Sequence, residues 1–200
     1  GRDTSFTKTL SLLRKGFLLL LDFKTNKMIH ANELKAGEYN EYYKQYIDQV
    51  PGSLGIAQAL EKGMEETRDF FTSLSEDELL LRYEEGKWTP KEVLLHLIDT
   101  ERIFSYRALR FSRMDSTPLQ GFEQDDFVLS SDANSRTIDS LIAEYVAVRQ
   151  CSLLLYASMT AQTIANIGTA SGSPMSPRAA VFITAGHERH HIRIIKERYL

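Results

Sequence analysis

Residues 88–113, which read WTPKEVLLHLIDTERIFSYRALRFSR, contain the clearest helix start in the chain. Thr89 is a favourable N-cap, and Pro90 suits the first helical position. Glu92, three residues after the cap, can complete a capping box. The pattern predicts a helix that runs to about Arg113, roughly six to seven turns long.

A second stretch, residues 186–200, reads GHERHHIRIIKERYL and holds three of the five histidines. On a helix, His187 and His191 lie about 40° apart around the axis and roughly 6 Å apart along it, so their imidazoles can share one metal ion. His190 is about 100° from His191 and is expected to point elsewhere. The alternative is a polar helix face with two ordinary histidines, and a third ligand elsewhere would favour the metal site.

Composition limits the class of protein. The 200 residues suffice for one domain, with or without an extension, and 42% hydrophobic content can form a core. The net charge of -3, with mixed signs, argues against a nucleic-acid partner. The single cysteine, Cys151, excludes an intramolecular disulfide, suits a cytoplasmic protein and is expected to be a buried, inert thiol. No stretch approaches the ~20 apolar residues that span a membrane.

Other segments also have helical periodicity, and neither internal repeats nor a phosphate-binding glycine loop occur. Helices are predicted at residues 38–50, 53–73, 75–81 and 137–159, and from Ser176-Pro177 into the histidines. Residues 168–177 are expected to be a Gly/Ser/Pro loop. Residues 114–136 form a long connection, in which Phe122 and Phe127 are expected to pack on the bundle. Asp125 and Asp126 can reach a pocket but are more readily explained as solvated loop acids.

Residues 1–35 differ from the rest and are predicted to form an N-terminal extension, with the bundle domain at 36–200. Gly1 is expected to be a cleavage remnant. The apolar run Phe17–Leu21 is too short for a signal peptide, and Asp22 follows it directly. Met28 can be the natural start, and the structure of the extension stays open between a hairpin and a helix.

His96 is the natural third partner for the histidine pair. A lone histidine between Leu95 and Leu97 is usually a satisfied core residue, but opposite His187 and His191 it becomes a metal ligand. Three neutral imidazoles on rigid helices leave a coordination position open for water or substrate, as in catalytic rather than structural sites. Zinc, nickel and iron all accept imidazole, so the ligands do not choose the metal.

Two motifs in this order resemble the DinB/YfiT-like superfamily: residues 88–110 and the closing residues 186–191, GHERHH. The resemblance covers roughly residues 38–200. It implies an all-α, up-down-down-up four-helix bundle, often a homodimer, with a divalent metal held by His96, His187 and His191. Some relatives are thiol S-transferases that use low-molecular-weight thiols, and others are described as metal-dependent hydrolases or isomerases.

The chemistry expected is a metal that lowers the pKa of a bound water or thiol on a small-molecule substrate. Glu188, Asp99 and Glu101 are candidates for orienting an imidazole or accepting a proton. Arg107 and Arg110 can bind an anionic substrate, although salt bridges explain them equally well.

Two other classes of function compete. Residues 187–191 match H-E-x-x-H, the zincin peptidase pattern, with Glu188 as base. Only nine residues follow His191, however, so the third ligand must come from upstream, which disfavours a peptidase. The non-enzyme alternative is a stress-associated metal- or ligand-binding bundle, for which a fourth protein ligand such as Asp126 or His190 would argue. His30 lies outside the matched region and is expected at the surface.

Overall fold

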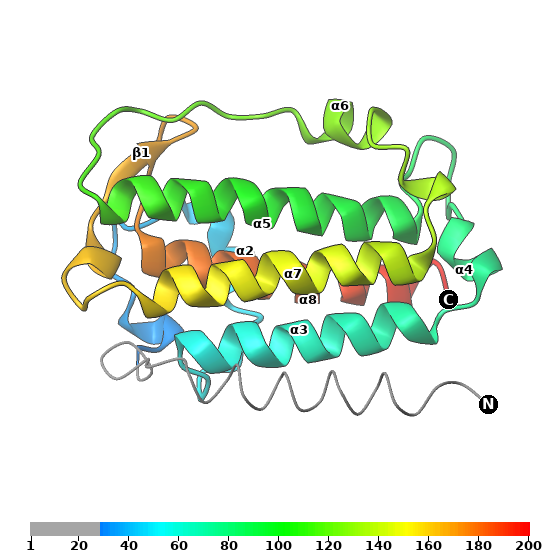
Figure 1. Ribbon diagram of the computed structural model, residues 1–200, viewed down its shortest axis with the longest axis horizontal. Helices are drawn as coiled ribbons and strands as arrows, with labels where there is room; N and C mark the ends of the chain where they lie inside the picture. Colours follow the sequence, from blue (N-terminus) through cyan, green and yellow to red (C-terminus); the bar gives the residue numbers. More distant parts are fainter. Residues whose placement is uncertain (1–28) are drawn as a thin grey trace.

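Four long helices form the bundle in the computed structural model, which describes residues 29–200 (Figure 1). They are α3 (Ile56–Ser73), α5 (Pro90–Ser112), α7 (Ile138–Ala157) and α8 (Pro177–Arg198). The colours in Figure 1 show that α3 and α8 run in one direction and α5 and α7 in the other. Each helix packs on two neighbours, since α5 and α3 both contact α7 and α8. The predicted up-down-down-up four-helix bundle is therefore confirmed.

The helix starts follow from local capping. The Thr89 side chain accepts a hydrogen bond from the Glu92 backbone N–H, and Ser176 and Thr137 cap α8 and α7 in the same way. Helix α3 is the exception, because its N-cap is Gly55 and not the predicted Ser53.

The α5–α7 connection must return along the whole bundle, because the two helices are parallel (Figure 1). It contains α6 (Gln124–Leu129) and a 3-10 turn, η3 (Ala133–Ser135), where a loop was expected. Val128 is its buried anchor, whereas Phe127 is 46% exposed and packs against Phe122. The expectation that Phe127 fastens this segment to the bundle was wrong, because one turn of helix directs Val128 inward instead.

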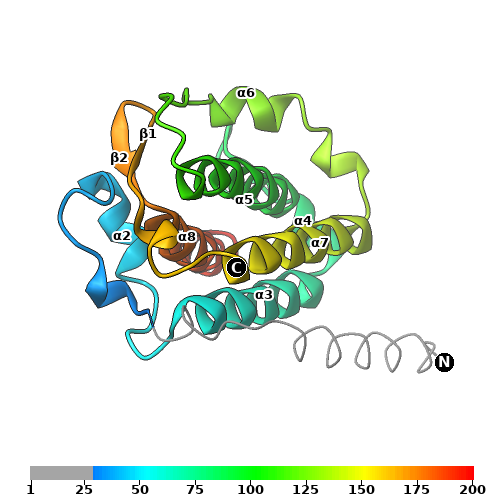
Figure 2. The same cartoon turned by 60° about the vertical axis from the view of Figure 1, so that its left-hand side comes forward.

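The other connections are compact. Helix α4 (Glu76–Leu80) joins α3 to α5, as predicted. Between α7 and α8 lie η4 (Thr163–Ala165) and a hairpin of β1 (Gly168–Ala170) and β2 (Ser173–Met175), where only a loop was expected. Figure 2 shows this hairpin beside one end of the bundle. Backbone hydrogen bonds from Leu119 to Thr169 and from Ser171 to Leu119 tie the long connection to it.

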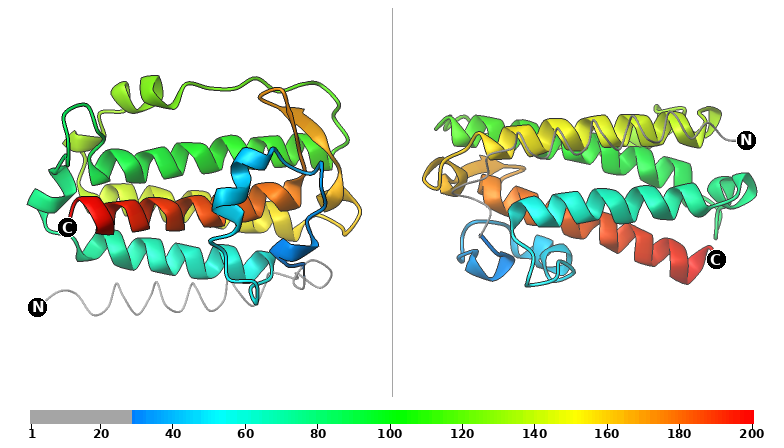
Figure 3. Two further views of the ribbon diagram at one scale, coloured as in Figure 1. Left: turned by 180° about the vertical axis from the view of Figure 1, so that it is seen from behind. Right: turned by 60° about the horizontal axis from the view of Figure 1, so that its bottom comes forward.

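The segment before α3 is less helical than predicted. Residues 38–50 form η2 (Glu41–Tyr43) and the single turn of α2 (Lys44–Ile47), preceded by η1 (Ala31–Glu33). Helix α2 lies across α8 (Figure 3). The expectations for Gly1, Met28 and the apolar run before it fall outside the described residues.

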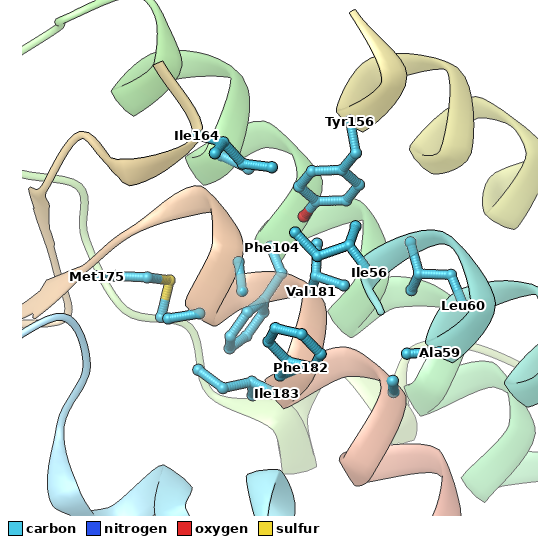
Figure 4. Packing of buried hydrophobic residues seen from close by; sticks show 14 of the residues in the cluster. Ile56, Ala59, Leu60, Phe104, Tyr156, Ile164, Met175, Val181, Phe182 and Ile183 are labelled. Carbon is cyan, nitrogen blue, oxygen red and sulfur yellow. The ribbon is translucent and has the colours of Figure 1, made fainter. Parts of the chain in front are cut away.

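The core consists of two apolar clusters, one toward each end of the bundle. Figure 4 shows the cluster around Phe104, Tyr156 and Phe182. The other includes Phe71, Leu94 and Ile195. On every long helix, the residues between the two clusters include polar or small ones, so a polar layer crosses the middle of the bundle. None of the described helices is long and apolar enough to cross a membrane.

Cys151 is exposed, so the prediction of a buried thiol was wrong. The inward face of α7 carries Tyr145, Arg149, Ser152 and Tyr156, spaced by three or four residues. Cys151 falls between these positions and therefore faces out of the core.

Candidate metal centre

Three imidazoles converge in the polar layer, between the antiparallel helices α5 and α8. His96 and His187 are buried and His191 is half-buried. The Nε2 atom of His187 lies 3.2 Å from Nε2 of His96 and 2.9 Å from Nε2 of His191. One ligand atom from each ring falls within a single 4.8 Å group.

This donor set fits a tetrahedral divalent ion. Zinc binds histidine nitrogen at about 2.0–2.1 Å, which places two ligands of a tetrahedron roughly 3.3 Å apart. The separations of 3.2 and 2.9 Å between Nε2 of His187 and Nε2 of His96 and His191 are close to that value. Direct hydrogen bonds among the rings are a weaker explanation, because a neutral imidazole offers one donor and one acceptor only.

Burial keeps the three imidazoles neutral. It lowers the pKa of His96 from 6.5 to about 4. The pKa values of His187 and His191 are also held well below 6.5, first by burial and then by the neighbouring imidazoles. Neutral imidazole is the form that binds metal, so the site is prepared for an ion at physiological pH.

Aromatic rings pack around the triad. The Trp88 ring lies 4.8 Å from that of His96, and the Tyr46 ring lies 5.0 Å from that of His187. Gly186 allows the second contact, because a Cβ atom there would lie 1.9 Å from the Tyr46 carbonyl oxygen. This glycine brings α2 against α8 one residue before His187.

A pocket of about 280 Å³ opens beside the triad. His96 and His187 form part of its wall. The rest comes from η2, α2, α5, α8, residues 121–124 at and before the start of α6, and the hairpin turn at Ser171. A metal at the triad would therefore have a space next to it that a small molecule can enter.

The three candidate carboxylates lie elsewhere. Glu188 accepts hydrogen bonds at Oε2 from Tyr145 and Arg149, both at 2.6 Å. Glu101 accepts from Arg149 at 2.7 and 3.0 Å. Asp99 pairs with Arg102 at 3.4 Å and lines a separate shallow hollow with Asp126. Among the residues that the structure describes, no hydrogen bond joins any of the three candidates to an imidazole.

Arg149 is the residue that sequence reasoning missed. It is fully buried and also donates to the Leu60 carbonyl oxygen at 2.7 Å, so it links α3, α5, α7 and α8. Gly63 makes room for this network, since a Cβ atom there would lie 1.7 Å from Glu188 Oε1. A lone arginine at an inward position of the apolar helix 137–159 was the available clue.

The other histidines and the two candidate arginines occupy different places in the structure. His190 contacts the Tyr46 ring and lies 3.4 Å from both Gln49 and Arg193, outside the ligand cluster. His30 also lies outside it. Arg110 is bound to Asp115 and Tyr106 at the surface, whereas Arg107 is buried in the pocket wall.

Comparisons with known proteins agree with this architecture. Among solved structures, the chain is similar to YfiT from Bacillus subtilis, described as a probable metal-dependent hydrolase with an unusual four-helix bundle topology. The two share 18% sequence identity with a TM-score of 0.63, over 82% of this chain and 90% of YfiT. No curated protein matches the chain. The family model of the DinB superfamily matches residues 59–195, which include all three histidines of the triad. The chain therefore belongs to the DinB superfamily.

Proposed function

We propose that this protein is a metal-dependent enzyme that holds one divalent ion with His96, His187 and His191 and acts on a small molecule in the adjoining pocket. The observation that carries the proposal is the convergence of three neutral Nε2 donors, two of which belong to residues in the wall of a cavity. A structural metal site would be closed by a fourth protein ligand, and no fourth histidine, cysteine or carboxylate joins this cluster among residues 29–200.

The bound ion would supply a Lewis acid and lower the pKa of a coordinated water or thiol. The chain's own residues would hold it rigidly. His96 comes from α5 and the other two ligands from α8, and Arg149 joins these helices through Glu101 and Glu188. The network therefore fixes the spacing of the ligands without contacting the reacting atoms.

Hydrolysis is the reaction we favour, with thiol S-transfer as the second candidate. YfiT, which shares the fold, is described as a probable metal-dependent hydrolase. A peptidase of the zincin type receives no support, because Glu188 is engaged by Arg149 and Tyr145 and so is unable to serve as a base at the triad.

Elemental analysis of untagged protein by plasma mass spectrometry tests the site. We expect about one zinc, nickel or iron per chain in the parent protein and in His190→Ala, and loss of it in His191→Ala. His190 is a matched control because it is the adjacent histidine on the same helix. Equal metal content in both variants would refute the assignment.

Catalysis needs a separate assay. The metal-loaded protein would be screened against small esters and amides, and against alkylating substrates with a low-molecular-weight thiol. Turnover that disappears in His191→Ala supports an enzyme. Stoichiometric metal without turnover in either screen would favour the non-enzymatic metal-binding bundle.

A further inference from the structure

Arg107 is a buried charge without a buried counter-charge. Its side chain is among the largest fully buried ones in the described chain, with the residue 2% exposed. The other buried arginine, Arg149, is neutralised by Glu101 and Glu188. No carboxylate of residues 29–200 lies within ion-pair distance of Arg107.

The partners of Arg107 are neutral. Its Nη2 atom donates to the Gln120 carbonyl oxygen at 3.0 Å and to Ser171 Oγ at 2.8 Å. The guanidinium carbon lies 5.2 Å from the centre of the Phe104 ring. Both hydrogen bonds use one of the three guanidinium nitrogens, and the neutral Tyr43 hydroxyl is a further hydrogen-bond partner. With five N–H donors, the guanidinium still has donors for another acceptor. An arginine held in this way is preorganised to bind a planar oxyanion.

Arg107 and the histidine triad share the same pocket. Arg107 follows His96 by eleven residues on α5, which places the two only about 20° apart around the helix and roughly 16 Å apart along it. Helical side chains lean toward the N-terminus, so the guanidinium extends back toward His96. Thr100 and Phe104 lie between them on the same wall.

Aromatic rings form much of the remaining wall. Tyr42, Tyr43, Tyr46 and Phe122 line the pocket together with Phe104. A cavity of about 280 Å³ with such walls suits a small apolar or planar body. Glu123 also lines the pocket but is exposed, so solvent weakens its charge to a modest repulsion of a bound anion, and it forms no ion pair with Arg107.

We propose that Arg107 is an anion-binding residue for the substrate, which is a small carboxylic acid with an apolar or aromatic body. The carboxylate binds the guanidinium and the body packs against the tyrosines, so the reacting group extends toward His96 and His187. This inference rests on the proposed function for the role of the histidines, but the carboxylate subsite itself needs no metal.

Isothermal titration calorimetry with two probes tests the subsite. The probes are 3-phenylpropanoate and its neutral analogue, 3-phenylpropanamide, each titrated into zinc-loaded and chelator-treated protein. We expect the acid to bind more tightly than the amide in both forms. Arg107→Gln should weaken binding of the acid by about tenfold to a hundredfold, the range for a lost charged hydrogen bond, and leave the amide nearly unchanged.

Arg110→Gln is the matched control, because Arg110 is on the same helix but pairs with Asp115 outside the pocket. It should leave binding of both probes unchanged. Two exposed pocket residues give a test that does not disturb the buried guanidinium. Gln124→Glu should weaken binding of the acid about threefold and Glu123→Gln should strengthen it by a similar factor.

Equal binding of acid and amide to the parent protein would overturn the subsite. So would an acid affinity that is lost with the metal and unaffected by Arg107→Gln, since the carboxylate would then be bound by the ion. If Arg107→Gln fails to fold, the opposite responses of the Glu123 and Gln124 variants decide the question. Absence of metal in the parent protein would refute the proposed function alone, because the chelator-treated titrations do not depend on it.

Discussion

Replacing Arg149 by methionine should destabilise the protein more than most single substitutions. Methionine replaces only the aliphatic part of the arginine side chain, and the change removes the hydrogen bonds to Glu101, Glu188 and the Leu60 carbonyl oxygen. Two carboxylates, each 2% exposed, would then lose their main cation. Glu188 would keep only the longer contact of 3.8 Å with Arg189. Burial already raises the pKa of Glu188, and Arg149 opposes that effect, so without Arg149 the Glu188 carboxylate would be still harder to ionise.

The magnitude follows from the two pairs that are lost. Removing one partner of a buried pair lowers the free energy of unfolding by about 3–5 kcal/mol. Arg149 serves two glutamates, so we expect about 4 kcal/mol or more at pH 7. Total stabilities are usually about 5–15 kcal/mol, so the variant should fold but be marginal. With a urea slope of about 2 kcal/mol/M, the midpoint of unfolding should fall by roughly 2 M.

The assay is urea unfolding followed by circular dichroism, with chelator present so that metal binding does not contribute. The control is the triple variant Arg149→Met, Glu101→Gln, Glu188→Gln, which removes the buried negative charges as well. Replacing a whole buried ionic cluster by neutral groups is often nearly neutral, so the triple variant should recover most of the lost stability. A loss below about 1 kcal/mol for the single variant, or a triple variant no more stable than the single one, would refute this reasoning.

Three further predictions concern the metal centre. Gly186→Ala should lower the free energy of unfolding by about 2 kcal/mol in urea unfolding, because its Cβ meets the Tyr46 backbone, whereas Gly52→Ala, with open space around it, should have little effect. Zinc at a hundred times its Kd should raise Tm by about 5–10 °C in a thermal scan of the parent protein and have no such effect on His191→Ala. In chelator-treated protein, His96 takes up a proton near pH 6.5 in the unfolded chain but only near pH 4 in the folded chain. This difference at His96 should therefore lower the free energy of unfolding by about 3 kcal/mol as the pH falls from 7 to 4. The measurement is the urea midpoint as a function of pH for the parent protein and His96→Gln. An equal loss of stability in both between pH 7 and 4 would contradict the attribution of this loss to His96.

The long helices and the histidine triad were predictable because they depend on local chemistry. The cap at Thr89 and the apolar spacing after it determine α5, and Ser176-Pro177 does the same for α8. Once both helices exist, the spacing of His187 and His191 places them on one side of α8. The choice of His96 as the third ligand came from its place on the other long helix and from the short stretch after His191, and the family resemblance agreed with it.

The polar layer could not be predicted in the same way. Glu101 and Glu188 were singled out as possible proton acceptors because of their proximity to the ligands in sequence. Their actual partner, Arg149, follows Glu101 by 48 positions and approaches from α7. Sequence periodicity indicates that Arg149 faces inward but does not indicate which helix it will face, because that depends on the long connection between α5 and α7.

The two parts of the candidate site, the histidine triad and the pocket, also differ in how well the local sequence predicts them. The metal ligands stand on long, capped helices, which are stable in position and readily predicted. The pocket is completed by segments that were predicted poorly, namely η2 with the single turn α2, residues 121–124 at and before the start of α6, and the hairpin turn at Ser171. These segments lack the apolar repeat of the long helices, so little in the local sequence determines their conformation. Connecting segments also tolerate substitutions more easily than the helices that they join. We therefore expect substitutions on the helices to abolish metal binding and substitutions in these connections to alter which small molecule is bound.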